Sequence, residues 1–125
     1  MAPAPTLQEL YAIHTGKVSD KWSLYLDVYE AAFARFRDRP IAFAEIGVQN
    51  GGSLEIWAKY FAQAPVVVGC DIDPKCGSLA FDDPRIAVVV GNVNTDATYR
   101  AILAHSPLYD VFIDDAEVIE VGRLR

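Results

Sequence analysis

A glycine-rich turn followed by an acidic residue is the feature of this sequence whose residue types are suited to chemistry. The turn spans Gly47–Gly52, and Asp71 follows 24 residues after Gly47. The N–H groups at the start of a helix bind anionic groups, and glycine lets a ligand approach the backbone closely. An acidic residue about 20 residues beyond such a turn is placed to accept hydrogen bonds from ribose hydroxyls. These features indicate a nucleotide-type site, although the turn alone also fits a simple strand-to-helix connection.

The residue in the middle of the turn narrows the choice of cofactor. Dinucleotide sites use G-x-G-x-x-G, whose second glycine lets the backbone approach the pyrophosphate. Gln49 takes that place here, which disfavours NAD and FAD. S-adenosylmethionine has an adenosine but no pyrophosphate, and it carries a sulfonium cation. Glu45 suits its positively charged end, and backbone N–H groups suit its carboxylate. Glu45, Gly47, Gln49 and Gly51 are therefore the expected cofactor-binding residues of this turn.

Acidic side chains gather where the predicted strands are expected to end. They are Glu45, Asp71, Asp73, Asp114 and Asp115. Ligands of open α/β sheets bind beyond the carboxyl ends of the strands, so this rim favours a sulfonium or a divalent metal. Asp114 and Asp115 are candidate ligands of Mg²⁺, which prefers carboxylate oxygens and favours the alkoxide form of a substrate hydroxyl. The alternative is that Asp114 only caps the next segment. Asn92 either meets the adenine or ribose, or is only a turn residue.

The elements that position these residues alternate between short apolar runs and helical segments. Apolar runs predict strands over 41–46, 66–70, 86–90 and 109–113, and helical spacing predicts helices over 53–63 and 96–105. Parallel strands are buried on both faces and therefore look apolar throughout. Right-handed crossovers with a reversal after the third strand give the order 3-2-1-4. The expected fold class is α/β, an incomplete Rossmann-like parallel sheet with helices on both faces and an N-terminal helical segment.

Three parts of the chain are expected. Residues 1–39 form the helical segment, residues 40–115 the cofactor-binding half-domain, and residues 116–125 an atypical tail. The first part holds a short helix over Leu7–His14 and a longer helix that Ser19 would cap. A further short helix is expected within 75–81.

The composition limits which binding partners and which cellular compartment are expected. The chain has 125 residues, the size of one domain, and 11 basic against 17 acidic residues leave a net charge of −6. That balance argues against nucleic acid and against anionic membranes as partners. No apolar run reaches the roughly 18 residues of a membrane helix, and Met1–Leu10 lacks the pattern of a secretory signal. Cys70 and Cys76 are expected to be free thiols, which together predicts a cytoplasmic protein.

Five segments, in order and at consistent spacing, resemble class I S-adenosylmethionine-dependent methyltransferases. They are Glu45–Ser53 (EIGVQNGGS), Trp57–Phe61, Gly69–Pro74 (GCDIDP), Arg85–Asn92 (RIAVVVGN) and Tyr109–Asp115 (YDVFIDD). The sequence is most similar to the bacterial group of macrolide-sugar O-methyltransferases and cephalosporin-hydroxylase-like proteins. The resemblance covers about residues 15–115.

The resemblance implies a role for each matching residue. Glu45, Gly47 and Gly51 would line the methionine part, Asp71 would bind the ribose, Asn92 would lie beside the adenine, and Asp114 or Asp115 would bind a metal. After the paired aspartates, relatives usually continue with a small residue, serine and histidine, and then three more strands. This chain instead continues with Ala116 and Glu117, as though truncated. The fourth strand is therefore expected to be an open edge that favours self-association.

The function expected from residues and resemblance together is methyl transfer from S-adenosylmethionine to a hydroxyl of a small molecule, such as a sugar or natural product. One alternative is a truncated, non-catalytic Rossmann-like binding module. The other is an NAD-dependent oxidoreductase, which Gln49 disfavours.

Overall fold

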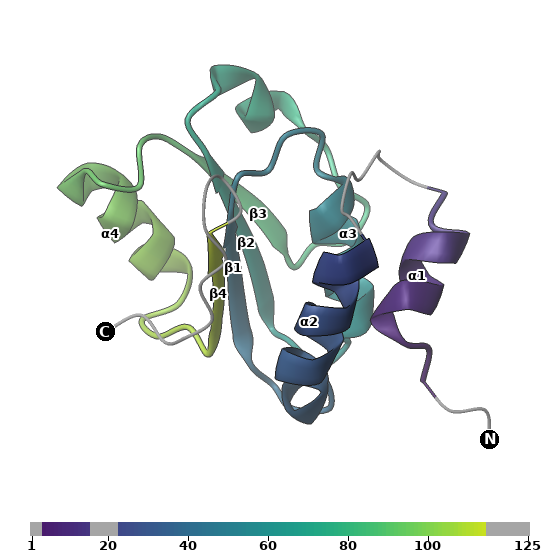
Figure 1. Cartoon of the computed structure of the whole chain (residues 1–125). Helices are drawn as coiled ribbons and strands as arrows, with labels where there is room; N and C mark the ends of the chain where they lie inside the picture. The colour runs from purple at the N-terminus through teal and green to yellow at the C-terminus, as the bar shows by residue number, and fades with distance from the viewer. Residues whose placement is uncertain (1–3, 16–22, 115–125) are drawn as a thin grey trace.

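The computed structural model describes residues 4–15 and 23–114 and contains a four-stranded sheet (Figure 1). Its strands are β1 (Ala42–Ile46), β2 (Val66–Asp71), β3 (Ile86–Val90) and β4 (Val111–Asp114). The strand order is β3-β2-β1-β4, and every neighbouring pair is parallel. The predicted α/β class and the order 3-2-1-4 are both confirmed. Because β1 lies between β2 and β4, and β2 lies between β3 and β1, these two strands are the central ones of the sheet.

Helices connect the strands and precede the sheet. They are α1 (Leu7–Ile13), α2 (Ser23–Phe33), the 3₁₀ helix η1 (Ala34–Phe36), α3 (Gly52–Tyr60), the 3₁₀ helix η2 (Pro74–Ser78) and α4 (Asp96–His105). Several predicted boundaries were wrong by a few residues. The helix expected over 53–63 spans Gly52–Tyr60, the one expected within 75–81 is a 3₁₀ turn over Pro74–Ser78, and the strand expected over 109–113 spans Val111–Asp114. Asp73 starts that turn because its carboxylate accepts the Lys75 N–H. The expected cap Ser19 and the tail 116–125 lie outside the described residues.

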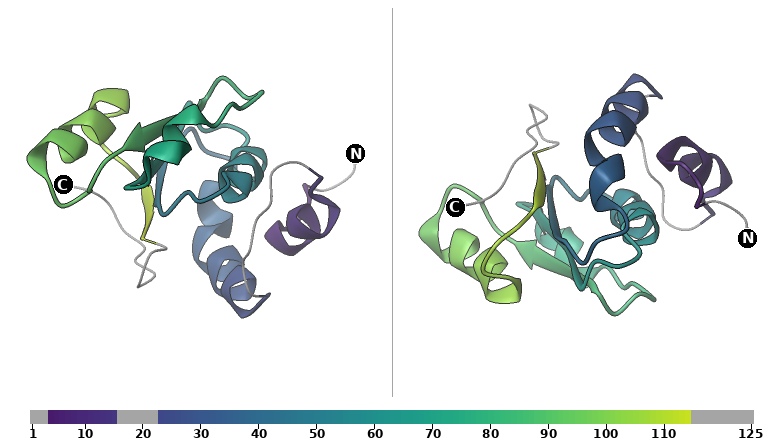
Figure 2. Two further views of the ribbon diagram at one scale, coloured as in Figure 1. Left: turned by 90° about the horizontal axis from the view of Figure 1, so that it is seen from above. Right: turned by 90° about the horizontal axis from the view of Figure 1, so that it is seen from below.

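The helices cover the two faces of the sheet unequally. Helices α1, α2 and α3 lie on one face and α4 lies on the other (Figure 2). Because side chains alternate along a strand, Phe43 of β1 joins the first layer while Ala44 and Ile46 join the second. Trp57 of α3 is fully buried in the first layer. Its ring centroid lies 5.3–5.9 Å from those of Tyr29, Phe33, Phe43, Tyr60 and Phe61.

Hydrogen bonds fasten the N-terminal helices to this layer. The Glu30 carboxylate accepts the Leu7 N–H at 3.1 Å and also accepts the hydroxyl of Tyr60 on α3. One carboxylate thus joins α1, α2 and α3. Within the part of the chain that the structure describes, no helix has both the length and the apolar character that crossing a bilayer requires.

Gly69 lets the sheet approach the glycine turn. A Cβ atom at this position of β2 would lie 2.5 Å from Val48 Cγ2 and 2.6 Å from Leu54 Cδ1. Real Cβ atoms do not approach that closely, so only glycine lets β2 pass beneath the turn and the first residues of α3. The close contact fixes the position of the turn relative to the end of β2.

Candidate functional site

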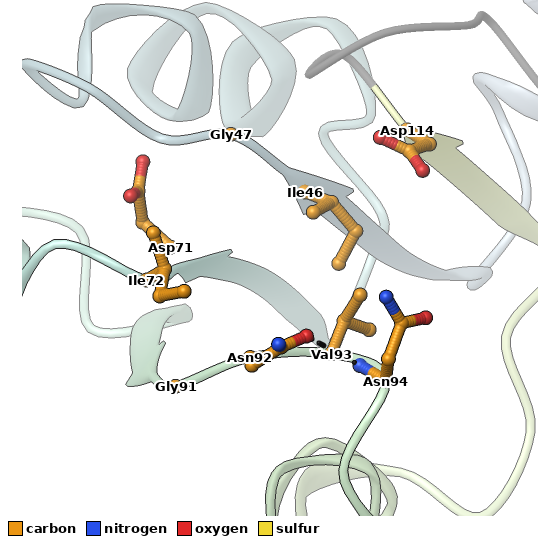
Figure 3. Close-up of a pocket in the computed structure, with 9 residues that line it drawn as sticks. All are labelled: Ile46, Gly47, Asp71, Ile72, Gly91, Asn92, Val93, Asn94 and Asp114. Atoms are coloured by element: carbon orange, nitrogen blue, oxygen red, sulfur yellow. Dashed lines mark hydrogen bonds between the residues drawn. The ribbon is translucent and has the colours of Figure 1, made fainter.

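A cavity of about 370 Å³ opens at the carboxyl ends of the strands. That volume falls within the range of roughly 300–1,000 Å³ typical of small-molecule sites. Its walls come from the ends of β1, β2 and β4 and from the loops that follow β1, β2 and β3 (Figure 3). The lining residues are Ile46, Gly47, Asp71, Ile72, Gly91, Asn92, Val93, Asn94 and Asp114.

The structure brings four of the predicted site residues together in this cavity. They are Gly47, Asp71, Asn92 and Asp114. Asp71 and Asp114 lie at opposite ends, with Ile46 and Val93 between them (Figure 3). Gln49, Gly51 and Glu45 do not line the cavity, and Asp115 lies outside the described residues. Gly47 and Asp71 thus meet as the sequence spacing predicts.

The glycine turn adopts left-handed backbone conformations at three positions. Gly47 has φ 95°, and its N–H donates to the Cys70 carbonyl at 2.8 Å. Gly51 has φ 86° and precedes the first residue of α3. Gln49 has φ 52°, a region that costs a residue with a side chain about 1–2 kcal/mol. Other contacts must therefore stabilise the turn enough to offset the unfavourable backbone conformation of Gln49.

Asp71 supplies the hydrogen bonds that hold the turn. One oxygen, Oδ2, accepts the Val48 N–H at 2.8 Å and the Gln49 N–H at 3.1 Å, while Oδ1 accepts the Asp73 N–H at 2.9 Å. Burial alone would raise the pKa of the Asp71 carboxyl, but these backbone hydrogen bonds outweigh it and the pKa lies below its ordinary value. A carboxylate has about four acceptor positions. The three backbone bonds leave one of them, for which the Cys76 thiol and a ligand hydroxyl would compete.

Glu45 lies on the other face of β1 from the cavity. Its side chain is fully buried and accepts hydrogen bonds from the Ser53 hydroxyl at 2.5 Å and from the Trp57 indole N–H at 3.3 Å. Strand alternation explains this placement, because Ile46 points into the cavity and Glu45, one residue earlier, points toward α3. In the structure Glu45 anchors the start of α3, and its contact with a cofactor stays a prediction.

The loop after β3 forms the floor of the cavity. The Asn92 side-chain oxygen accepts the Asn94 N–H at 2.9 Å, and the Thr95 hydroxyl donates to the Asn92 carbonyl at 2.8 Å. Thr95 also caps α4 by accepting the Thr98 N–H. The start of α4 therefore fixes the backbone that carries Asn92.

The sequence motifs did not predict the apolar and amide residues of the lining, among them Ile72, Val93 and Asn94. Ile72 directly follows Asp71 and is 68% exposed, which is unusual for a large apolar side chain in a chain with this much core. An apolar residue immediately after a strand-ending aspartate was the available signal.

Asp114 is the described residue of the predicted metal pair. It ends β4 and lines the cavity away from Asp71. Among residues 4–15 and 23–114, no group of three or more His, Cys, Asp or Glu side chains is arranged to hold a metal ion. The described residues thus supply one carboxylate at this end, and metal binding stays a prediction.

Comparison with known proteins identifies the relatives of this site. No protein-family model matches the chain. It is 36% identical over 110 residues to 8-demethyl-8-alpha-L-rhamnosyl tetracenomycin-C 2'-O-methyltransferase of Streptomyces olivaceus, covering 81% of this chain and 28% of that protein. It is 28% identical to demethylmacrocin O-methyltransferase of Streptomyces fradiae, covering 92% of this chain and 30% of that protein.

The fold agrees with these relatives. The solved structure of MycE methyltransferase from the mycinamycin biosynthetic pathway, in complex with Mg, SAH and mycinamycin VI, matches 90% of this chain with a TM-score of 0.69 and 28% identity. Over most of its own length the chain is similar to part of the S-adenosylmethionine-dependent methyltransferases. It spans less than a third of the length of the curated methyltransferases that it matches and 30% of the MycE chain. The resemblance expected from the sequence motifs is therefore confirmed.

Proposed function

We propose that this chain forms the S-adenosylmethionine-binding part of an O-methyltransferase that acts on a sugar hydroxyl of a natural product. The observation that carries the proposal is the cavity between Gly47 and Asp71 at the ends of the two central strands. Two similar proteins are named as O-methyltransferases of tetracenomycin rhamnosyl groups, and the solved neighbour holds SAH. These names support a sugar as the acceptor class.

The described residues fit the cofactor in chemistry as well as in volume. The remaining acceptor capacity of Asp71 suits a ribose hydroxyl, and the exposed side chain of Ile72 with Val93 suits the faces of an adenine ring. Asn92 suits the polar edge of the base. The bound cofactor would supply the methyl group and its sulfur leaving group. Asp71 and Asp114 place negative charge at both ends of the cavity, which favours a sulfonium cation there.

Asp114, together with Asp115, is proposed to hold Mg²⁺ beside the acceptor hydroxyl. Carboxylate oxygens are the ligands that Mg²⁺ prefers. The MycE complex contains Mg, which supports a metal in this group of enzymes. In this chain Asp114 would orient the ion at the end of the cavity opposite Asp71.

Isothermal titration with S-adenosylhomocysteine tests the cofactor site. The wild-type chain is expected to bind, and Asp71→Asn is expected to weaken binding about 10-fold or more, since a hydrogen bond to a charged group contributes about 1.5–3 kcal/mol. Asp73→Asn is the matched control, because it removes a neighbouring charge that does not line the cavity. A folded chain that binds NADH more tightly than S-adenosylhomocysteine would instead favour the oxidoreductase alternative.

Three further properties belong to the same proposal. Residues 40–115 would hold the cofactor and residues 1–39 would form an N-terminal helical segment packed against them. The chain would reside in the cytoplasm, which suits its two free, buried thiols. Two copies would associate through the outer edge of β4, since this strand pairs only with β1 in the described part of the chain.

A further inference from the structure

Cys76 lies beneath the glycine turn. It belongs to η2, is 3% exposed, and directs its thiol to the Gln49 carbonyl with an Sγ–O distance of 3.5 Å. Burial, and after it the negative charge of Asp71, raise the pKa of the Cys76 thiol. The group is therefore a neutral S–H donor near pH 7. It has two acceptors within reach, the Gln49 carbonyl and the Asp71 carboxylate, and a hydrogen bond from the thiol also lowers the pKa of Asp71.

Gln49 is bound on both sides by one short segment. Its N–H donates to Asp71 and its carbonyl accepts from Cys76. The segment between these two partners is itself ordered, because the Asp73 N–H donates to Asp71 and the Cys76 N–H donates to the Asp73 carbonyl at 3.0 Å. Residues 71–76 thus hydrogen-bond both the N–H and the carbonyl of Gln49, which is the one described non-glycine residue with a positive φ.

We propose that Cys76 is a positioning residue of the cofactor site, because its thiol holds Gln49 in the left-handed conformation that keeps Gly47 and Asp71 at the cavity. The inference rests on the proposed function. Without the thiol, the Gln49 carbonyl loses a hydrogen-bond donor that helps to offset its unfavourable conformation, and the turn can relax away from Asp71. The Val48 and Gln49 N–H groups would then lose protection, and the cavity wall formed by Gly47 would shift.

Two measurements on the full chain test this inference. Cys76→Ala is expected to weaken S-adenosylhomocysteine binding about 3- to 10-fold, the effect of one lost neutral hydrogen bond. It is also expected to speed amide hydrogen exchange at Val48 and Gln49 by a similar factor. Cys76→Ser, which keeps a donor, should recover most of both values. Gln49→Gly in the Cys76→Ala background should recover binding, because glycine adopts a positive φ without strain.

Ile102→Val is the matched control. Ile102 is fully buried on the α4 face, in the layer away from Cys76, so its change lowers stability without touching the turn. Unchanged affinity and unchanged exchange in Cys76→Ala would overturn the inference, as would an equal effect from Ile102→Val. If the wild-type chain binds no S-adenosylhomocysteine, the proposed function fails, while exchange at Val48 and Gln49 still decides whether Cys76 holds the turn.

Discussion

At Asp71, one carboxylate has two tasks. It holds the glycine turn through the Val48 and Gln49 N–H groups, and it forms one end of the cavity. Its sequence position predicts only the contact with a ribose. The structural task means that hydrogen bonds of the chain itself order the turn, which lowers the cost of ordering the site on binding.

The hydrogen bonds of Asp71 make part of the stability pH-dependent. The folded-state pKa lies below the unfolded value of about 3.9, so the carboxylate contributes stability above about pH 4 and loses it as the pH falls through the folded pKa. Urea unfolding of the wild type and Asp71→Asn should show a stability difference near neutral pH that shrinks below pH 4. A difference that stays constant down to pH 2.5 would contradict this assignment.

At the scale of elements, Arg85 joins the start of β3 to the end of α3. Its guanidinium donates to the carbonyls of Ala58 at 2.6 Å, Phe61 at 3.1 Å and Ala64 at 3.0 Å, and it pairs with Asp83 at 2.6 Å. The last carbonyls of a helix have no partner within the helix, and Arg85 supplies one for Ala58 in the last turn of α3. The Phe61 and Ala64 carbonyls belong to the segment that directly follows the helix. This contact spans more than 20 positions of the chain, so helical periodicity does not reveal it.

Arg85→Met should therefore destabilise the chain. We expect a loss of about 2 kcal/mol, since carbonyls that accepted a charged donor are left without it. Arg100→Met on the exposed surface of α4 is the matched control, with an expected change within about 0.5 kcal/mol. Urea unfolding measures both, and equal midpoints for the two variants would show that Arg85 does not hold α3.

The close contact at Gly69 gives a second test at this scale. Gly69→Ala should lower stability by about 1–3 kcal/mol, because the new Cβ would overlap Val48 and Leu54. Gly77→Ala is a matched control, since its new Cβ would meet only Val90 Cγ2 at 3.1 Å. Thermal unfolding should place Gly69→Ala clearly below Gly77→Ala. The reverse order would mean that β2 does not support the turn from below.

At the scale of the whole molecule, the two edge strands of the sheet are the surfaces on which another chain could pair. Both β3 and β4 pair on one side only within the described residues, and strand edges with unpaired backbone groups attract other strands. On β4, Phe112 is only partly buried and its side chain lies on the α4 face. This edge carries the proposed self-association.

Phe112→Lys should shift the chain toward monomer. A lysine on an edge strand opposes strand pairing through its charge and its hydration. Light scattering over a concentration series should detect dimer for the wild type and less dimer for the variant. Val28→Lys on α2 is the control, because Val28 is 47% exposed and belongs to a helix rather than to an edge strand. A wild type that stays monomeric at every concentration would refute edge pairing.

The sequence by itself determined the alternation of strands and helices, the parallel order 3-2-1-4 and the meeting of Gly47 with Asp71. These follow from local patterns and from general rules of handedness, which do not depend on the details of packing. Even the missed limits at Tyr60 and Pro74 are shifts of a few residues, as expected where end contacts decide the boundary.

Only the tertiary structure decided which side chains share the cavity. Ile72 and Asn94 enter it while Glu45 turns to Ser53 and Trp57 on the other face. The physical reason is that strand alternation and loop geometry set the direction of each side chain, and both depend on contacts between segments far apart in the chain. For the same reason, no local pattern shows that Asp71 accepts the Gln49 N–H and that the Cys76 thiol donates to the Gln49 carbonyl.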